Sequence, residues 1–101
     1  MITNNSWLFR ELRKLPNLAL SSTYDPLIEV HFEGRSYRIY SPESSEYIIT
    51  CDIVEKVEAM GGNVISYPTS WCQASMEAES FGKTKGVDVI PHARLFKILS
   101  K

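Results

Sequence analysis

The side chains best suited to chemistry lie in two short tracts, PTSWC around Ser70 and PH at His92. A thiol, an imidazole and a hydroxyl are the groups from which nucleophilic sites are built. A helix that begins near Ser70 would favour a thiolate at Cys72 through its dipole and would offer its free backbone N–H groups to an anion. The sequence therefore makes Cys72 and His92 candidate catalytic residues, and Thr69 and Ser70 candidate anion-binding or ligand-binding residues.

Simpler structural roles account for the same residues. Ser70 suits the N-cap of a helix, because Ser70-x-x-Gln73 has the spacing of a capping box. His92 lies near the apolar stripe of Leu95 and Leu99, which is typical of a packed core histidine. A small enzyme or an anion-binding α/β domain is therefore the alternative to a non-enzymatic function.

The sequence also bears on metal binding, membrane association and cellular compartment. Cys51, Cys72, His31 and His92 show no paired spacing of the kind that zinc sites use, so neither a metal nor a cofactor is predicted. No apolar run approaches the ~20 residues of a membrane span, and the N-terminal tract does not have the pattern of a signal peptide. Both cysteines are then expected as thiols in a reducing compartment, which predicts a cytoplasmic protein without membrane association.

Length and charge restrict the function classes further. The 101 residues fit a single domain spanning residues 1–101, and the net charge is −1. A non-specific nucleic-acid binder needs an excess of Lys and Arg, which this chain lacks. Nucleic-acid binding stays a further alternative, because several basic residues could share one face: Arg10, Arg13, Lys14, Lys83, Lys85, Arg94, Lys97 and Lys101.

Charge is also distributed unevenly along the chain. Residues 41–60 carry five Asp or Glu against one Lys, a net −4, and residues 83–101 carry five Lys or Arg against one Asp, a net +4. Such blocks are most often solvated helix faces. Two complementary blocks could also meet a partner or a second copy of the chain.

The apolar pattern predicts one α/β (or α+β) domain. Strands 27–32 and 35–40 alternate apolar and polar residues around Glu33-Gly34, which predicts a hairpin that pairs Ile28 with Ile39. Its outer face would carry His31, and its inner side chains would be Ile28, Val30, Phe32, Tyr37 and Ile39. A turn at Gly34-Arg35, which would pair Phe32 with Tyr37, is the alternative. Strands 64–67 and 87–90, joined by a helix over 71–81, form a βαβ unit, and such units have parallel strands. An N-terminal helix over 5–15, a helix from Asp52 to Gly61 and a last helix after Pro91 complete the fold on a mixed sheet. Residues 46–50 suit either a strand or the start of the helix that follows.

The tract from Val54 to Leu99 resembles a BRCT domain. VEKVEAMGGNVIS is similar to the first helix, glycine pair and following strand of that family, and KGVDVIP is similar to its last strand. The next strand of the family has no counterpart between Ser66 and Trp71. We therefore do not infer a phosphopeptide site for this chain from the resemblance.

Two side chains on the predicted 71–81 helix lie away from its apolar stripe. Trp71, Ala74, Ala78 and Phe81 form that stripe, so Cys72 and Met76 should point outward. Methionine is adaptable interface material, and Trp7 lies at the edge of its own helix stripe. The sequence therefore predicts a small non-enzymatic interaction module, self-associating as a homodimer, with Trp7, Cys72 and Met76 in the interface. Small proteins of this sort also occur in mobile genetic elements.

Overall fold

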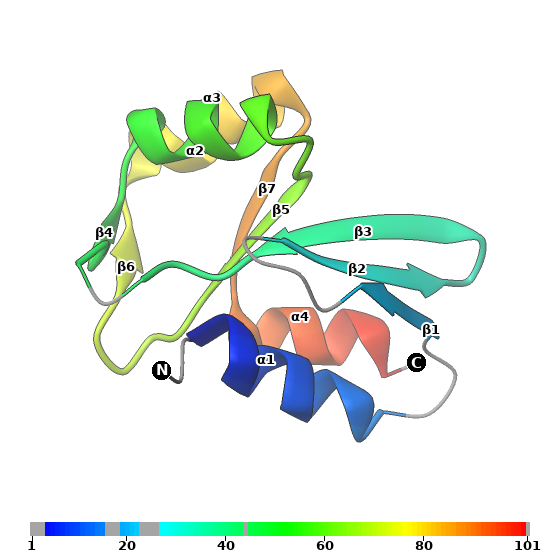
Figure 1. The fold of residues 1–101 in the computed structure, drawn as a ribbon. Coiled ribbons are helices and arrows are strands. Elements are labelled where there is room, and N and C mark those ends of the chain that lie inside the picture. Colours follow the sequence, from blue (N-terminus) through cyan, green and yellow to red (C-terminus); the bar gives the residue numbers. More distant parts are fainter. Residues whose placement is uncertain (1–3, 16–18, 23–26, 44, 101) are drawn as a thin grey trace.

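The computed structural model describes residues 4–15, 19–22, 27–43 and 45–100. The helices and strands in these ranges are shown in Figure 1: α1 (Asn4–Arg13), β1 (Ala19–Ser22), β2 (Leu27–Phe32), β3 (Arg35–Tyr40), β4 (Ile48–Ile49), α2 (Cys51–Ala59), β5 (Val64–Tyr67), β6 (Gln73–Ala74), α3 (Met76–Lys85), β7 (Asp88–Pro91) and α4 (His92–Leu99). Together they form an α/β domain in which helices pack on a mixed sheet, as the sequence predicts.

The hairpin of β2 and β3 forms in the predicted register, with Ile28 opposite Ile39. Glu33 and Gly34 make the turn with φ values of 51° and 78°, and a two-residue type I′ turn requires positive φ at both positions. The predicted inner side chains are buried or, for Tyr37, half-buried, and His31 is exposed on the other face. The alternation of apolar and polar residues is therefore sufficient to fix this part of the fold.

The main sheet has five strands in the order β1-β2-β3-β5-β7. The first three strands are antiparallel, and β3, β5 and β7 run parallel. The predicted βαβ unit is confirmed, since β5 and β7 are parallel and directly paired, with Val64 opposite Asp88. The edge strand is β7, which leads into α4.

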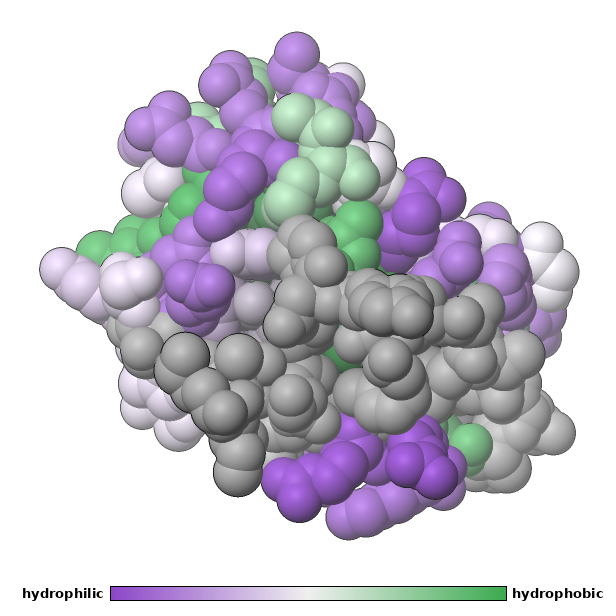
Figure 2. Space-filling model, in the orientation of Figure 1, coloured by the Kyte–Doolittle hydropathy of each residue, from purple (hydrophilic) through white to green (hydrophobic). Residues whose placement is uncertain are grey.

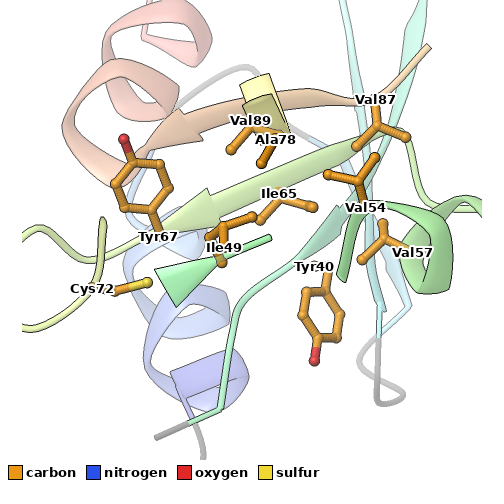
Figure 3. Packing of buried hydrophobic residues seen from close by; sticks show 10 residues of the cluster. All are labelled: Tyr40, Ile49, Val54, Val57, Ile65, Tyr67, Cys72, Ala78, Val87 and Val89. Atoms are coloured by element: carbon orange, nitrogen blue, oxygen red, sulfur yellow. The ribbon is translucent and has the colours of Figure 1, made fainter. Parts of the chain in front are cut away.

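Helices cover both faces of the sheet, as Figure 1 shows. One core lies beneath α1 and α4 and contains Leu8, Leu12, Leu95 and Leu99. The other lies beneath α2 and α3 and is drawn in Figure 3. Side chains along a strand alternate between faces, so successive residues of β5 supply both cores.

The helix predicted over 71–81 is displaced along the chain. The observed α3 begins at Met76, with Ser75 as N-cap, because the Ser75 hydroxyl accepts a hydrogen bond from the backbone N–H of Ala78. Residues 73–74 form β6 instead, so the capping box predicted from Ser70 does not form. Gly82 lies inside the helix, and Gly86 ends it with a φ of 75°. Ala78 is buried against the sheet, as predicted, whereas Trp71 precedes the helix and is 38% exposed, so its predicted place in the inner stripe is wrong.

The segment before α2 resolves the alternative left open by the sequence. Ile48–Ile49 is a strand, β4, which pairs in parallel with β6 to form a separate two-stranded sheet. The following helix begins at Cys51 with Thr50 as N-cap, and no side chain caps it. The helix therefore starts one residue before the predicted Asp52.

Candidate functional site

The two-stranded sheet of β4 and β6 has a buried side and an exposed side. Ile49 is fully buried and belongs to the core beneath α2 and α3. Ile48 is 41% exposed and lies opposite the exposed Gln73. Backbone hydrogen bonds from Gln73 to Tyr47 (3.1 Å) and from Ser75 to Ile49 (3.2 Å) hold the two strands together. The small sheet is thus anchored on one side and free on the other.

Most of the large apolar side chains that the described residues leave at the surface lie on or near this sheet. Five such side chains are exposed among them, and four lie on β4 or β6 or within two residues of these strands. We call these four the apolar patch: Tyr47 (61% exposed), Ile48 (41%), Trp71 (38%) and Met76 (82%). The fifth, Met60, lies at the end of α2. Hydrophobic residues reach the surface over β4 at the left of Figure 2.

A hydrogen-bonded network fixes the loop that leads into β4. The Tyr40 hydroxyl donates to the Glu46 carboxylate (2.5 Å) and accepts from Lys56 Nζ (2.8 Å). Lys56 also forms an ion pair with Glu46 and lies 4.8 Å from the centre of the Tyr40 ring. The backbone N–H of Glu43 donates to the same carboxylate (2.9 Å). Strand β3, the loop and α2 are thereby tied together immediately before the apolar patch.

The protonation states of this network indicate a structural role for it. Burial and the bond to Glu46 raise the pKa of Tyr40 to about 12, so its hydroxyl stays protonated. Burial alone would raise the pKa of Glu46, but hydrogen bonds from Lys56 and Tyr40 outweigh it and hold that pKa below its ordinary value. None of these groups changes charge near neutral pH, where a general acid or base has to do so.

Cys72 does not lie where the sequence predicts. It precedes β6 rather than sitting in a helix, and its side chain is only 4% exposed. Figure 3 shows it at one end of the core cluster, beside Tyr67 and Ile49. Its thiol donates to the backbone carbonyl of Glu46 (3.3 Å), and burial raises its pKa. The predicted outward orientation is wrong, because Cys72 is not helical and its side chain is buried, and the same burial disfavours the predicted thiolate.

His92 lies on the opposite face of the sheet from Cys72. Its Nδ1 is 2.5 Å from the hydroxyl of Ser66, and both residues are buried. Ser66 alternates with Ile65 and Tyr67, which belong to the Cys72 cluster, and therefore points to the α1 and α4 side. Burial lowers the pKa of His92 to about 4, so the ring is neutral at physiological pH. The structure does not bring the two candidate catalytic residues together.

The other candidate residues are placed as follows. Thr69 and Ser70 are exposed in the turn before β6, five or more residues ahead of α3, so the N-terminus of that helix is not beside them. Met76 is the most exposed of the large apolar residues described. Trp7 belongs to α1, but its side chain lies outside the described residues.

The basic residues are divided between the two faces of the sheet. Arg10 and Arg13 lie on α1 and Lys97 lies on α4, which together cover one face, whereas Lys83 and Lys85 end α3 on the other (Figure 1). Lys101 lies outside the described residues. Lys83 and Arg94 line one cleft at the β7 edge, but Glu79 and Asp88 line it too, so the described basic residues do not form one continuous basic face.

A cleft of about 270 Å³ lies beside the β7 edge, between α3 and α4. Its charged lining contains both signs: Glu79, Asp88, Lys83 and Arg94. The edge offers little to an added strand, because the Val87 N–H already donates to Gly82 and Pro91 has no N–H. Within the described ranges, no three His, Cys, Asp or Glu side chains could hold a metal ion, and no helix is long and apolar enough to cross a membrane.

Comparison with known proteins finds no relative of this chain. No protein-family model, no curated protein and no solved structure matches this chain. The similarity to BRCT domains therefore stays a likeness of short motifs, and the apolar patch beside β4 and β6 is the feature from which a function can be argued.

Proposed function

We propose that this protein is a small non-enzymatic interaction module that self-associates through the apolar patch. One observation carries the proposal: four of the five large apolar side chains exposed among the described residues gather at β4 and β6. Scattered surface apolar residues are ordinary in soluble proteins, whereas a cluster that includes an aromatic residue and a methionine is typical of a contact surface.

The patch is also supported from beneath. Ile49 and Cys72 anchor its inner side in the core, and the network of Tyr40, Glu46 and Lys56 fixes the loop that precedes it. A surface that is already ordered before contact loses less conformational freedom on binding. Full burial of one large apolar side chain is worth about 1.5–3 kcal/mol, and each patch residue, 38–82% exposed, can contribute a share of that amount toward the cost of association.

Two observations favour this proposal over its alternatives. A thiol–imidazole enzyme requires Cys72 and His92 within reach of each other, and the sheet lies between them. A nucleic-acid-binding protein requires one continuous basic surface, and the basic helices lie on opposite faces. The apolar patch needs neither arrangement.

Sedimentation equilibrium across the micromolar range tests the proposal. The wild-type protein should approach twice the 11.5 kDa chain mass as its concentration rises. Ile48→Lys places a charge in the patch and should shift the protein toward monomer. Met60→Lys makes the same kind of change at the fifth exposed apolar residue, outside the patch, and should not. A wild-type protein that stays monomeric throughout, or equal effects of the two substitutions, would contradict the proposal.

A further inference from the structure

The surroundings of the apolar patch are strongly acidic. The two segments that carry it, residues 41–52 and 69–80, contain five Asp or Glu and not one Lys or Arg. Lys56 offsets only one of these carboxylates, through its ion pair with Glu46. Two patches placed face to face would bring like charges together at their rims, which opposes association. The patch is therefore better suited to a surface that is basic.

Helix α3 carries such a basic surface at its far end. Its first turn contains Glu77 and Glu79, and its last turn contains Lys83 and Lys85. Met76, a member of the apolar patch, is its first residue. The helix thus runs from the acidic, apolar patch at one end to a basic end about 15 Å away.

The outer face of α3 is open along its whole length. Ala78 and Gly82 bury the inner face against the sheet. Met76, Ser80 and Thr84 follow one another at intervals of four residues on the opposite side, and all three are exposed. A serine at the middle of this row lets a second helix approach closely, because its side chain is small.

We infer that two copies of this chain pair through the outer faces of their α3 helices, antiparallel across a two-fold axis at Ser80. The inference rests on the proposed self-association and names its geometry. With Ser80 on the axis, Met76 lies level with Thr84 of the second copy, and Glu77 lies level with Lys83 of the second copy. The acidic end of each helix, with its apolar patch, then faces the basic end of the other.

This arrangement is self-complementary, as a two-fold contact must be. Lys85 lies 5.5 Å from the centre of the Phe81 ring of its own helix, and Lys83 lines the cleft at the β7 edge together with Glu79 and Asp88. Glu79 lies on the same flank of the row as Lys83, so Glu79 of one copy can reach Lys83 of the second copy, whereas Glu77 lies on the other flank.

Charge complementation between two variants provides the test. One variant carries Glu77→Lys and Glu79→Lys, and the other carries Lys83→Glu and Lys85→Glu. Each alone should show a dimer dissociation constant about tenfold higher than the wild type, because it sets like charges against each other. An equimolar mixture should recover a dimer near wild-type affinity, since the two altered helices are again complementary. Arg94→Glu with Lys97→Glu on α4 is the matched control and should leave the constant unchanged.

Salt dependence gives a second measurement that needs no variant. Pairing of opposite charges predicts that added NaCl weakens the wild-type dimer, whereas contact between two acidic rims predicts that NaCl strengthens it. Failure of the mixed variants to associate, or a dimer strengthened by salt, would overturn the α3 arrangement. Either result could occur while Ile48→Lys still dissociates the protein, so the proposed function and this geometry fail separately.

Discussion

The buried pair of His92 and Ser66 predicts how the stability of the fold depends on pH. The ring of His92, the first residue of α4, is buried with its centre 6.2 Å from the centre of the Phe96 ring. Its Nδ1 lies within hydrogen-bond distance of the Ser66 hydroxyl. Burial lowers the pKa of His92 to about 4 in the folded protein, against an ordinary value of 6.5. The folded state therefore resists a proton that the unfolded chain accepts.

The size and direction of the effect follow from these two pKa values. Above pH 6.5 the ring is neutral in both states, so it adds no pH dependence. Between pH 6.5 and pH 5 the unfolded chain binds a proton and the folded protein does not, and the free energy of unfolding falls. The loss is about 1.4 kcal/mol per pH unit, or roughly 2 kcal/mol by pH 5. In this range Glu46 stays charged, because its pKa is lowered.

Urea unfolding at pH 7.5, 6 and 5 measures this loss. His92→Asn removes the titrating ring, so its free energy of unfolding should be lower at pH 7.5 but nearly constant down to pH 5. His31→Asn is the matched control: His31 is exposed and its Nδ1 also lies 3.0 Å from a serine hydroxyl, yet the variant should keep the full pH dependence.

A wild-type pH dependence in His92→Asn would refute this reasoning. If that variant does not fold, the ring C–H resonances of His92 in the wild type decide the matter. They should stay at the neutral position down to pH 5, and a shift centred near pH 6.5 would show that the buried ring takes up a proton in the folded state.

Three further predictions follow from other buried contacts. In the native protein a thiol reagent should modify the half-buried Cys51 before the buried Cys72, whose pKa is raised, and faster loss of the Cys72 thiol in mass spectrometry would contradict its burial. Gly82→Ala should cost ~1–3 kcal/mol in urea unfolding, because the added Cβ would lie 2.4 Å from the Val87 carbonyl oxygen; an unchanged midpoint would show that α3 does not approach the sheet this closely. Tyr40→Phe should lower the free energy of unfolding by about 1 kcal/mol in the same assay, since the Tyr40 hydroxyl contacts both Glu46 and Lys56. An unchanged free energy of unfolding would show that this network does not stabilise the fold.

The parts of the fold that the sequence predicts are those with repeated local signals. The hairpin shows five inward apolar positions in strict alternation and a glycine where positive φ is needed, and its register is as predicted. The parallel pairing of β5 and β7 follows from the order of strand, helix and strand. By contrast, β4 and β6 are two residues long and about 25 residues apart, so neither alternation nor proximity marks them.

The error at α3 has a definite physical origin. Ser70 and Ser75 each have the character of an N-cap, and local sequence does not choose between them. Residues 73–74 pair with β4 and Cys72 is buried in the same cluster as Ile49, so contacts with a strand far from Ser70 in sequence place the helix start at Met76. Met76 is exposed as predicted because it is helical in both cases, whereas Cys72 is not helical and its predicted orientation is lost.

The sheet separates the groups that govern stability in acid from those that are proposed to govern contact. Ser66 and His92 lie with α1 and α4, while the apolar patch and α3 lie on the other side. His92→Asn should therefore lower the free energy of unfolding at neutral pH without changing the dimer dissociation constant, and Ile48→Lys should raise the dimer dissociation constant. Self-association also stabilises the folded state in proportion to the logarithm of concentration. The midpoint of wild-type urea unfolding should then rise with protein concentration, and that of Ile48→Lys should not, which ties the proposed contact to a measurement independent of mass.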